Sequence, residues 1–333
     1  MSFLWFYTLM ASMAFFSVLP AAAMEPPRTL LGPAFSDPNH VAPKSDTWVK
    51  RPIIYTKAHQ GADVTVVLDQ HTYPALLPMV QAYARKHKLN IAVKEGTCGI
   101  SEGMLNRKQL DIGGYCCPAA AQERLPGLTF HTLGISALAI LAHPENPVDN
   151  LTANEVRKIF QGQMTQWPQV QSAKGKQYNK PIQPVARLHC KIRPGHWRLI
   201  LDNEDLFHSR VSQVGSIPDM IAQVAKLKGS LGYEEIWITT HRYKKLGQVK
   251  LLHIDGYDPM DHASLIQGHY PFYRVHNIST WEAEGLANPQ AQALVSYLRK
   301  NMDQVDPAFQ IIPADQLPAG GWSFKGTEII AAP

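Results

Sequence analysis

Apolar runs of strand length alternate with amphipathic helical segments along this chain, and this alternation constrains the fold more than any other feature. The run "DVTVVL" at residues 63–68 is typical of a buried strand, and residues 72–87 carry their apolar side chains on one helical stripe. A strand at 90–96, a short helix at 99–109 and a strand at 110–115 follow in the same way. Strands separated by helices at this spacing predict a parallel sheet with right-handed crossovers, and therefore an α/β fold.

The second half of the chain repeats the alternation. Thr152 and Glu155 form a capping box at the start of one helix. A chain of 333 residues, 45% of them hydrophobic, is long enough for two lobes that each have a core. The further predicted strands are 134–144, 181–188, 230–239 and 249–254, and the further predicted helices are 150–162, 195–203, 216–229 and 288–302.

The first 23 residues form an apolar stretch without a charged side chain, and it ends in "AAA". This pattern predicts a secretory signal peptide that is cleaved after Ala23, with an uncleaved anchor as the alternative. Residues 24–62 contain six prolines, which predicts an extended N-terminal arm.

The predicted signal peptide and the rest of the chain together indicate where the protein is located. No later run reaches the roughly 20 apolar residues of a spanning helix, so together with the signal peptide we expect an exported, periplasmic protein. Its net charge of +5 is scattered, which disfavours nucleic-acid binding.

Six segments, in order along the chain, carry a family resemblance. In residues 142–167 the letters NPV, LT and IF-x-G and a final Trp follow one another at characteristic positions. The chain resembles the PstS-like phosphate-binding family of periplasmic solute-binding proteins. The other five segments are "HTYP" (71–74), "EGTCGI" (95–100), "LDIGGYCCP" (110–118), "GSLGY" (229–233) and "HYPFYR" (269–274).

The resemblance implies a type II periplasmic binding protein, in which two α/β lobes joined by two crossing strands close over a solute. The first lobe would comprise residues 63–135 and 250–333, and the second lobe residues 136–249. The crossings would fall near 136–142 and 245–252. The carboxyl ends of the strands of both sheets would then face one crevice, where ligands bind in such folds.

The same resemblance suggests residues that hold an oxyanion. Thr72 and Tyr73 open the first helix, Thr97 lies where the family has a serine, and Arg187 matches an arginine that pairs with the anion. Helix N-termini and arginines favour negative charge in general.

The sequence departs from the family pattern at two places that bear on the specificity for phosphate. Cys116 stands where the family keeps an aspartate that accepts the proton of hydrogen phosphate. The loop that normally carries Ser-Gly-Thr is the longer "LHCKIRPGHW" at 188–197, in which His196 helps to open the next helix.

All four cysteines fall on loops that we expect to line the crevice, together with three histidines. One interpretation is disulfides, with Cys98 bonded to one member of the 116–117 pair and Cys190 to the other across the lobes. A second is a site for a transition metal such as Cu(I), Zn²⁺ or Hg²⁺, or for a trivalent arsenical. A third is thiol redox chemistry, although no C-x-x-C spacing is present. The residues are Cys98, Cys116, Cys117 and Cys190, with His71, His189 and His196.

No catalytic signature accompanies these features: the chain has no G-x-S-x-G, H-E-x-x-H, P-loop or dinucleotide-binding motif. We therefore expect a binding protein rather than an enzyme, without an obligatory cofactor. It would bind a small anion, phosphate or another oxyanion, as a monomer. Its partner would be an ABC-type permease or a membrane sensor. The alternative function is binding of a soft metal or a thiophilic ligand in the same cleft.

Overall fold

The computed structural model describes residues 34–172 and 178–333. The predicted signal peptide lies outside the described residues. Within the predicted arm, residues 34–62 contain only α1 (Asp46–Lys50) and the single-turn η1 (Lys57–His59). The Lys108 ammonium holds this segment by donating to the carbonyls of Val49 and Arg51, at 2.8 and 2.7 Å. Among the described residues, no helix has both the length and the apolarity needed to cross a membrane.

The first sheet is built on β1 (Val64–Asp69), which pairs in parallel with β2 (Ile91–Gly96) and β3 (Ile112–Tyr115). Next to β3 follow β10 (Tyr273–Trp281) and then β4 (Leu128–Ala142), both in antiparallel pairings. This sheet contains the first three strands that the sequence predicts.

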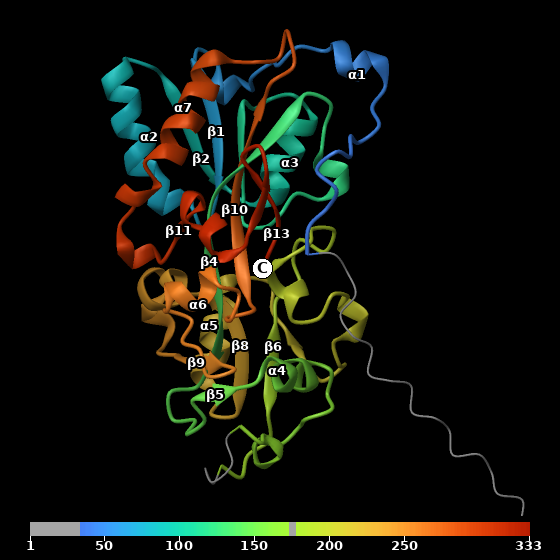
Figure 1. Cartoon of the computed structure of the whole chain (residues 1–333), viewed down its shortest axis with the longest axis vertical. Helices are drawn as coiled ribbons and strands as arrows, with labels where there is room; N and C mark the ends of the chain where they lie inside the picture. Colours follow the sequence, from blue (N-terminus) through green and yellow to red (C-terminus); the bar gives the residue numbers. More distant parts are fainter. Residues whose placement is uncertain (1–33, 173–177) are drawn as a thin grey trace, which may run out of the picture. The chain divides into compact units, whose positions relative to one another are not determined.

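Helices cover both faces of the first sheet. Side chains on a strand alternate between its faces, and every residue of β1 is buried, so both faces are packed. Val64, Val66 and Leu68 pack with α2 (Tyr73–His87) and α7 (Pro289–Lys300), which lie side by side in Figure 1. On the opposite face Val67 packs with α3 (Cys98–Asn106).

The second sheet uses the far half of β4. Residues 138–142 of β4 pair with β8 (Ser230–Glu235), and β8 pairs in parallel with β6 (Gln183–Ala186). On the same half of β4 lies β9 (Lys250–Ile254). The other short strands and α-helices between β4 and β10 in the chain are β5 (Asn150–Leu151), β7 (Ser212–Gln213), α4 (Ala153–Phe160), α5 (Ile217–Lys226) and α6 (His262–Ile266).

The two sheets share β4, which runs without interruption from one into the other (Figure 1). We call the first sheet with its helices the first lobe, and the second sheet with the elements between β4 and β10 in the chain the second lobe. The predicted two-lobed α/β fold is confirmed. The lobe boundaries at residues 135/136 and 249/250 stay predictions. The pairing of β9 with β4 favours a return to the first lobe nearer to β10 than to residue 250.

The expected helix at 195–203 is wrong in length and type. The structure has one 3-10 turn there, η4 (His196–Leu199). Gly195 and His196 both have positive φ, 77° and 46°, which lies outside the α-helical region, so an α-helix cannot begin at these residues. The remaining short strands and turns are η2 (Ala121–Glu123), η3 (Trp167–Gln169), η5 (Glu204–Leu206), η6 (Ile238–Arg242), η7 (Lys244–Leu246), η8 (Met302–Gln304), η9 (Pro307–Phe309), β11 (Ile312–Pro313), η10 (Ala314–Gln316), η11 (Pro318–Gly320), β12 (Ser323–Lys325) and β13 (Glu328–Ala331).

Candidate ligand-binding cleft and cysteine cluster

A cleft of about 550 Å³ opens where loops of the two lobes meet. Its size suits a small solute, and both lobes contribute to its wall. The lining residues are Asp69, Gln70, His71, Thr97, Cys98, Gly99, Cys116, Arg187, His189, Cys190, Arg193, Gly215, Ser216, Ile217, Pro218 and Tyr243.

Two helix N-termini, one from each lobe, reach this cleft. Thr97 caps α3, where its hydroxyl accepts from the Ile100 amide at 3.3 Å. Ser216 caps α5 in the same way, through the Asp219 amide at 3.3 Å. The first amides of a helix have no partner inside the helix and carry partial positive charge. The cleft is therefore suited to an anion.

A buried carboxylate, Glu234 at the end of β8, brings three cationic side chains together behind the cleft. It accepts from Arg274 at 2.8 Å, from Arg187 at 3.1 Å and from the His71 imidazole at 3.3 Å. Burial opposes ionisation, but Arg274 and Arg187 hold the pKa of Glu234 well below its usual value. This network joins the loop after β1, the end of β6, and strands β8 and β10.

His71 is held between two carboxylates. Its Nδ1 lies 3.1 Å from Asp69 Oδ1, and its Nε2 faces Glu234. Burial and Arg274 oppose protonation, but Cys116 and Asp69 raise the pKa of His71 well above its usual value. The imidazole is accordingly a cation that links the two lobes.

Of the residues predicted to bind ligand, Thr97, Cys116 and Arg187 line the cleft, as do Cys98, His189 and Cys190 from the second predicted set. Thr72 and Tyr73 are not among its lining residues. The Thr72 hydroxyl instead donates to Asp69 Oδ2 at 2.6 Å, which makes it a supporting residue.

His196 and Cys117 lie behind the lining residues. His196 is fully buried, and neither ring nitrogen has a hydrogen-bond partner among the described residues. Its ring stacks on His189 with the centroids 5.3 Å apart. Burial, reinforced by the neighbouring His189, lowers the pKa of His196 well below its usual value, so the ring is neutral. The predicted roles of these residues remain untested.

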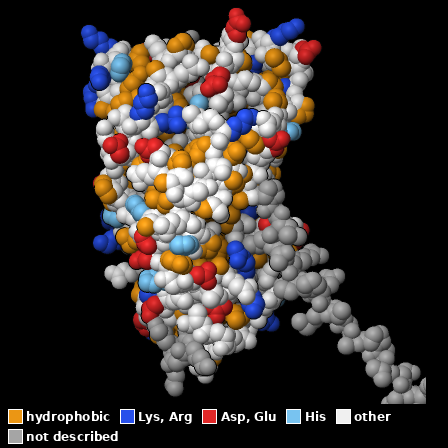
Figure 2. Space-filling model, in the orientation of Figure 1, with side chains coloured by type: hydrophobic (Ala, Val, Ile, Leu, Met, Phe, Trp, Pro, Cys, Tyr) orange, Lys and Arg blue, Asp and Glu red, His pale blue; other side chains and the backbone are white. Residues whose placement is uncertain are grey.

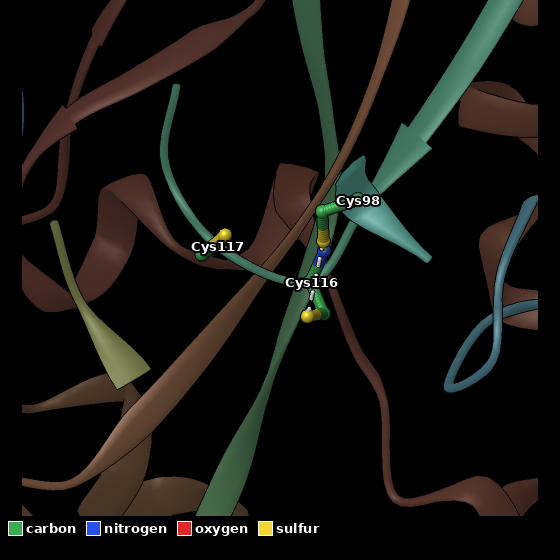
Figure 3. A group of neighbouring side chains, drawn as sticks. All are labelled: Cys98, Cys116 and Cys117. Carbon is green, nitrogen blue, oxygen red and sulfur yellow. Dashed lines mark hydrogen bonds between the residues drawn. The ribbon is translucent and has the colours of Figure 1, made fainter. Parts of the chain in front are cut away.

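Three cysteines form a buried cluster at the wall of the cleft. The sulfurs of Cys98, Cys116 and Cys117 all lie within 4.8 Å of one another. Figure 3 shows Cys98 next to Cys116, with Cys117 on the same loop as Cys116. The Cys98 and Cys116 sulfurs are 3.4 Å apart, and the Cys116 amide donates to Cys98 Sγ at 3.3 Å. The fourth cysteine, Cys190, is half-buried and interacts with Cys98 and Cys117.

The packing of α3 against β3 explains why these cysteines meet. A Cβ on Gly113 would lie 2.6 Å from a Leu105 methyl, so a larger residue there would force the buried Leu105 side chain to move. The Ser101 hydroxyl then donates to the Gly114 carbonyl at 2.9 Å. The start of α3 and the end of β3 are thereby brought together, with Cys98 on one and Cys116 just after the other.

The four thiols differ in acidity. Hydrogen bonds from Cys117 and Cys98 hold the pKa of Cys116 well below the usual thiol value. Hydrogen bonds from the same two thiols lower the pKa of Cys190. The hydrogen bond with Cys116 raises the pKa of Cys98, and burial raises that of Cys117. No S–S bond joins any of the four, all of which lie in the described ranges; a disulfide stays a prediction.

Arg193 is a residue that the sequence analysis missed. It lies on the loop after β6, yet its guanidinium donates to Glu123 at 2.7 Å from Nε and to Glu102 at 2.7 Å from Nη2. Both acceptors belong to the first lobe, so Arg193 fastens the loop that carries Cys190 across the cleft. The long insertion relative to the family pattern was the only signal for it in the sequence.

A buried Ser–His–Glu group in the interior does not have the geometry of a catalytic relay. His276 Nε2 faces both the Ser136 hydroxyl, at 2.8 Å, and Glu235 Oε1, at 3.4 Å. The acid and the hydroxyl thus share one ring nitrogen, whereas a relay needs them on opposite nitrogens. His276 Nδ1 has no partner among the described residues.

Comparison with known proteins places these features in a family. The model of the family described as "PBP superfamily domain" matches residues 55–301. An ABC-type phosphate transport receptor from Vibrio cholerae is similar in structure, with 20% identity, a TM-score of 0.58, and 75% of this chain and 99% of that chain covered. A putative phosphate ABC transporter substrate-binding protein from Clostridium perfringens, with bound phosphate, has 14% identity, a TM-score of 0.61 and the same coverage. At these identities the two structures establish the fold.

Proposed function

This chain belongs to the PBP superfamily, and from that premise we propose that it is an extracytoplasmic solute-binding receptor that holds a small oxyanion in the cleft between its lobes. The observation that carries the proposal is the convergence of two helix N-termini from different lobes on one cleft that also exposes Arg187. An anion that binds there gains contacts to both lobes at once, which favours the closed arrangement.

Arg187 supports this site in two ways. Its Nη2 is bonded to Glu234, which fixes the guanidinium at the wall of the cleft. Its Nε is buried and has no hydrogen-bond partner among the described residues. A buried donor without a partner costs free energy, so an acceptor oxygen from the ligand would satisfy it.

Phosphate is the first anion to test, because the two similar structures are described as phosphate receptors. Cys116, whose pKa the hydrogen bonds from Cys117 and Cys98 lower well below the usual thiol value, offers an acceptor for the P–OH proton in place of the family's aspartate. The partner would be an ABC-type permease, to which a monomeric receptor delivers its solute.

The surface itself carries no large field of one sign on the side that Figure 2 shows. Acidic and basic side chains are interspersed over the face in view, without a block of one sign.

Thermal unfolding of the metal-free, reduced protein tests the proposal directly. A ligand that binds only the folded state stabilises it by about 2.7 kcal/mol at 100 times its Kd. We expect phosphate and arsenate to raise the Tm, with chloride of equal ionic strength as the reference.

Two variants identify the site of binding. Arg187→Gln should abolish the shift that phosphate causes, whereas Arg210→Gln, on an exposed arginine of the same lobe, should keep it. The readout is the ligand-induced shift, so a lower starting Tm of either variant does not affect it. The oxyanion proposal fails if phosphate, arsenate and sulfate leave the wild-type Tm and titration heats unchanged.

A further inference from the structure

We propose that Cys98, Cys116 and Cys117 form a trithiolate site for one soft metal ion, Cu(I) or Zn²⁺, at the inner wall of the cleft. This goes beyond the receptor function and shares one residue, Cys116, with the proposed anion site. Their sulfurs lie within 4.8 Å of one another, and the closest pair is 3.4 Å apart. A metal–sulfur bond of about 2.3 Å places sulfur ligands of one ion roughly 3.8–4.0 Å apart. The cluster needs only small side-chain adjustments to reach that spacing.

The spacing also separates this arrangement from a disulfide framework. A covalent S–S bond is about 2.05 Å long and joins two sulfurs only. Here three sulfurs lie within 4.8 Å of one another, and the Cys98 and Cys116 sulfurs are 3.4 Å apart. Three mutually close sulfurs suit one metal ion better than one disulfide, and soft thiolates select Cu(I) or Zn²⁺.

Two features beside Cys98 and Cys116 favour the negative charge that a metal thiolate retains. Cys98 is the first residue of α3, at the positive end of a nine-residue helix. The Arg274 guanidinium lies 3.7 Å from Cys116 Sγ. Amide and guanidinium donors to ligand sulfurs are the outer contacts that stabilise metal thiolates.

The site also has an entry path. Cys98 and Cys116 line the cleft, so an ion can reach their sulfurs from it. Cys190 lines the same cleft on the second lobe and lies near Cys98 and Cys117. It could complete a tetrahedral set after a small movement of its loop. On binding, three S–metal bonds form and the protons still bound to the three sulfurs pass to the solvent.

A second group of potential ligands, Asp69, His71 and Cys116, shares one sulfur with the cluster. Both nitrogens of His71 are already bonded to carboxylates, of Asp69 and Glu234. Freeing the imidazole would break two buried interactions, so the trithiolate set is favoured.

The test starts from the full chain, reduced and stripped of metal under argon. Zn²⁺ and Cu(I) are titrated separately against a chelator of known affinity, and cysteine alkylation is then mapped by mass spectrometry. We expect one ion per chain and protection of Cys98, Cys116 and Cys117. Tighter binding of Cu(I) or of Zn²⁺ identifies the ion. An ion that leaves these three cysteines open to alkylation, or no binding of either ion, overturns the proposal.

Variants provide a second readout. Cys98→Ser and Cys116→Ser should each weaken the metal at least about 100-fold, since losing a ligand exceeds the effect of losing an outer contact. Met104→Leu is the matched control, because its sulfur belongs to the same buried cluster but not to the ligand set. If a serine variant does not fold, the alkylation map of the wild-type protein still decides. Unchanged affinity in a folded serine variant refutes the site.

Discussion

Replacing Glu234 by glutamine should test the network behind the cleft most directly. Glu234 is fully buried and accepts from Arg274, Arg187 and His71 at 2.8, 3.1 and 3.3 Å. Glutamine has nearly the same shape but no charge, so three cationic groups would lose their common counter-charge.

The magnitude follows from these distances. At an effective dielectric constant of 20, a unit pair at about 3 Å attracts by roughly 5–6 kcal/mol. Removing the carboxylate also removes its own desolvation penalty, which is several kcal/mol. The expected net loss of unfolding free energy is about 3–5 kcal/mol, the range for breaking one side of a buried ion pair.

The assay is urea unfolding of Glu234→Gln beside the exposed control Glu284→Gln. The control should change stability by less than about 0.5 kcal/mol. Because the pKa of Glu234 is depressed in the folded protein, its contribution is fully present above pH ~4.5 and is lost as the pH falls through the lower folded value. The difference between wild type and variant should therefore persist from pH 5 to 8 and shrink only in more acidic solution.

Anion rescue adds a second measurement. In Glu234→Gln, Arg187 and Arg274 lack their carboxylate, so millimolar phosphate or sulfate should stabilise the variant more than the wild type. A loss of less than about 1 kcal/mol at pH 7 would refute the electrostatic reasoning, since the lower limit for such a pair is about 3 kcal/mol.

Two more predictions concern charges elsewhere in the fold. Burial lowers the pKa of His131 to about 4, so its contribution is present above pH ~6.5 and is lost as the pH falls through 4. A lowering from 6.5 to about 4 corresponds to about 3 kcal/mol, and urea unfolding should show the wild type losing that much more than His131→Asn between these pH values. Burial raises the pKa of Glu123 to about 7 even beside Arg193, so in Arg193→Gln this carboxyl should take up a proton; the lost hydrogen bonds should lower stability by about 1–3 kcal/mol and speed amide hydrogen exchange in residues 188–196. Equal exchange in Arg193→Gln and in Arg210→Gln would show that Arg193 does not fasten this loop.

Local patterns in the sequence determined most of the elements. The strand at 63–68 and the capping box of Thr152 and Glu155 both appear as expected, because they depend on residues close in the chain. The helix predicted at 195–203 is only a 3-10 turn at 196–199, and two residues at its start adopt positive φ, which periodicity does not register. The sequence also indicated that the cysteines gather, since all four fall on loops expected to line one crevice, and Cys98, Cys116 and Cys117 do lie together.

Only the tertiary structure decided which charges meet. Glu234 lies 163 residues from His71, 47 from Arg187 and 40 from Arg274 along the chain. The sequence alone predicts only that it belongs to a strand. Arg193 likewise reaches Glu123 across 70 residues. These pairings depend on the registers of β8 and β10 against β4 and on the contact between lobes. The hydrophobic periodicity of the sequence indicates neither the registers nor that contact. A sequence pattern fixes which face of an element is buried; which charged groups share that buried space depends on how the elements pack.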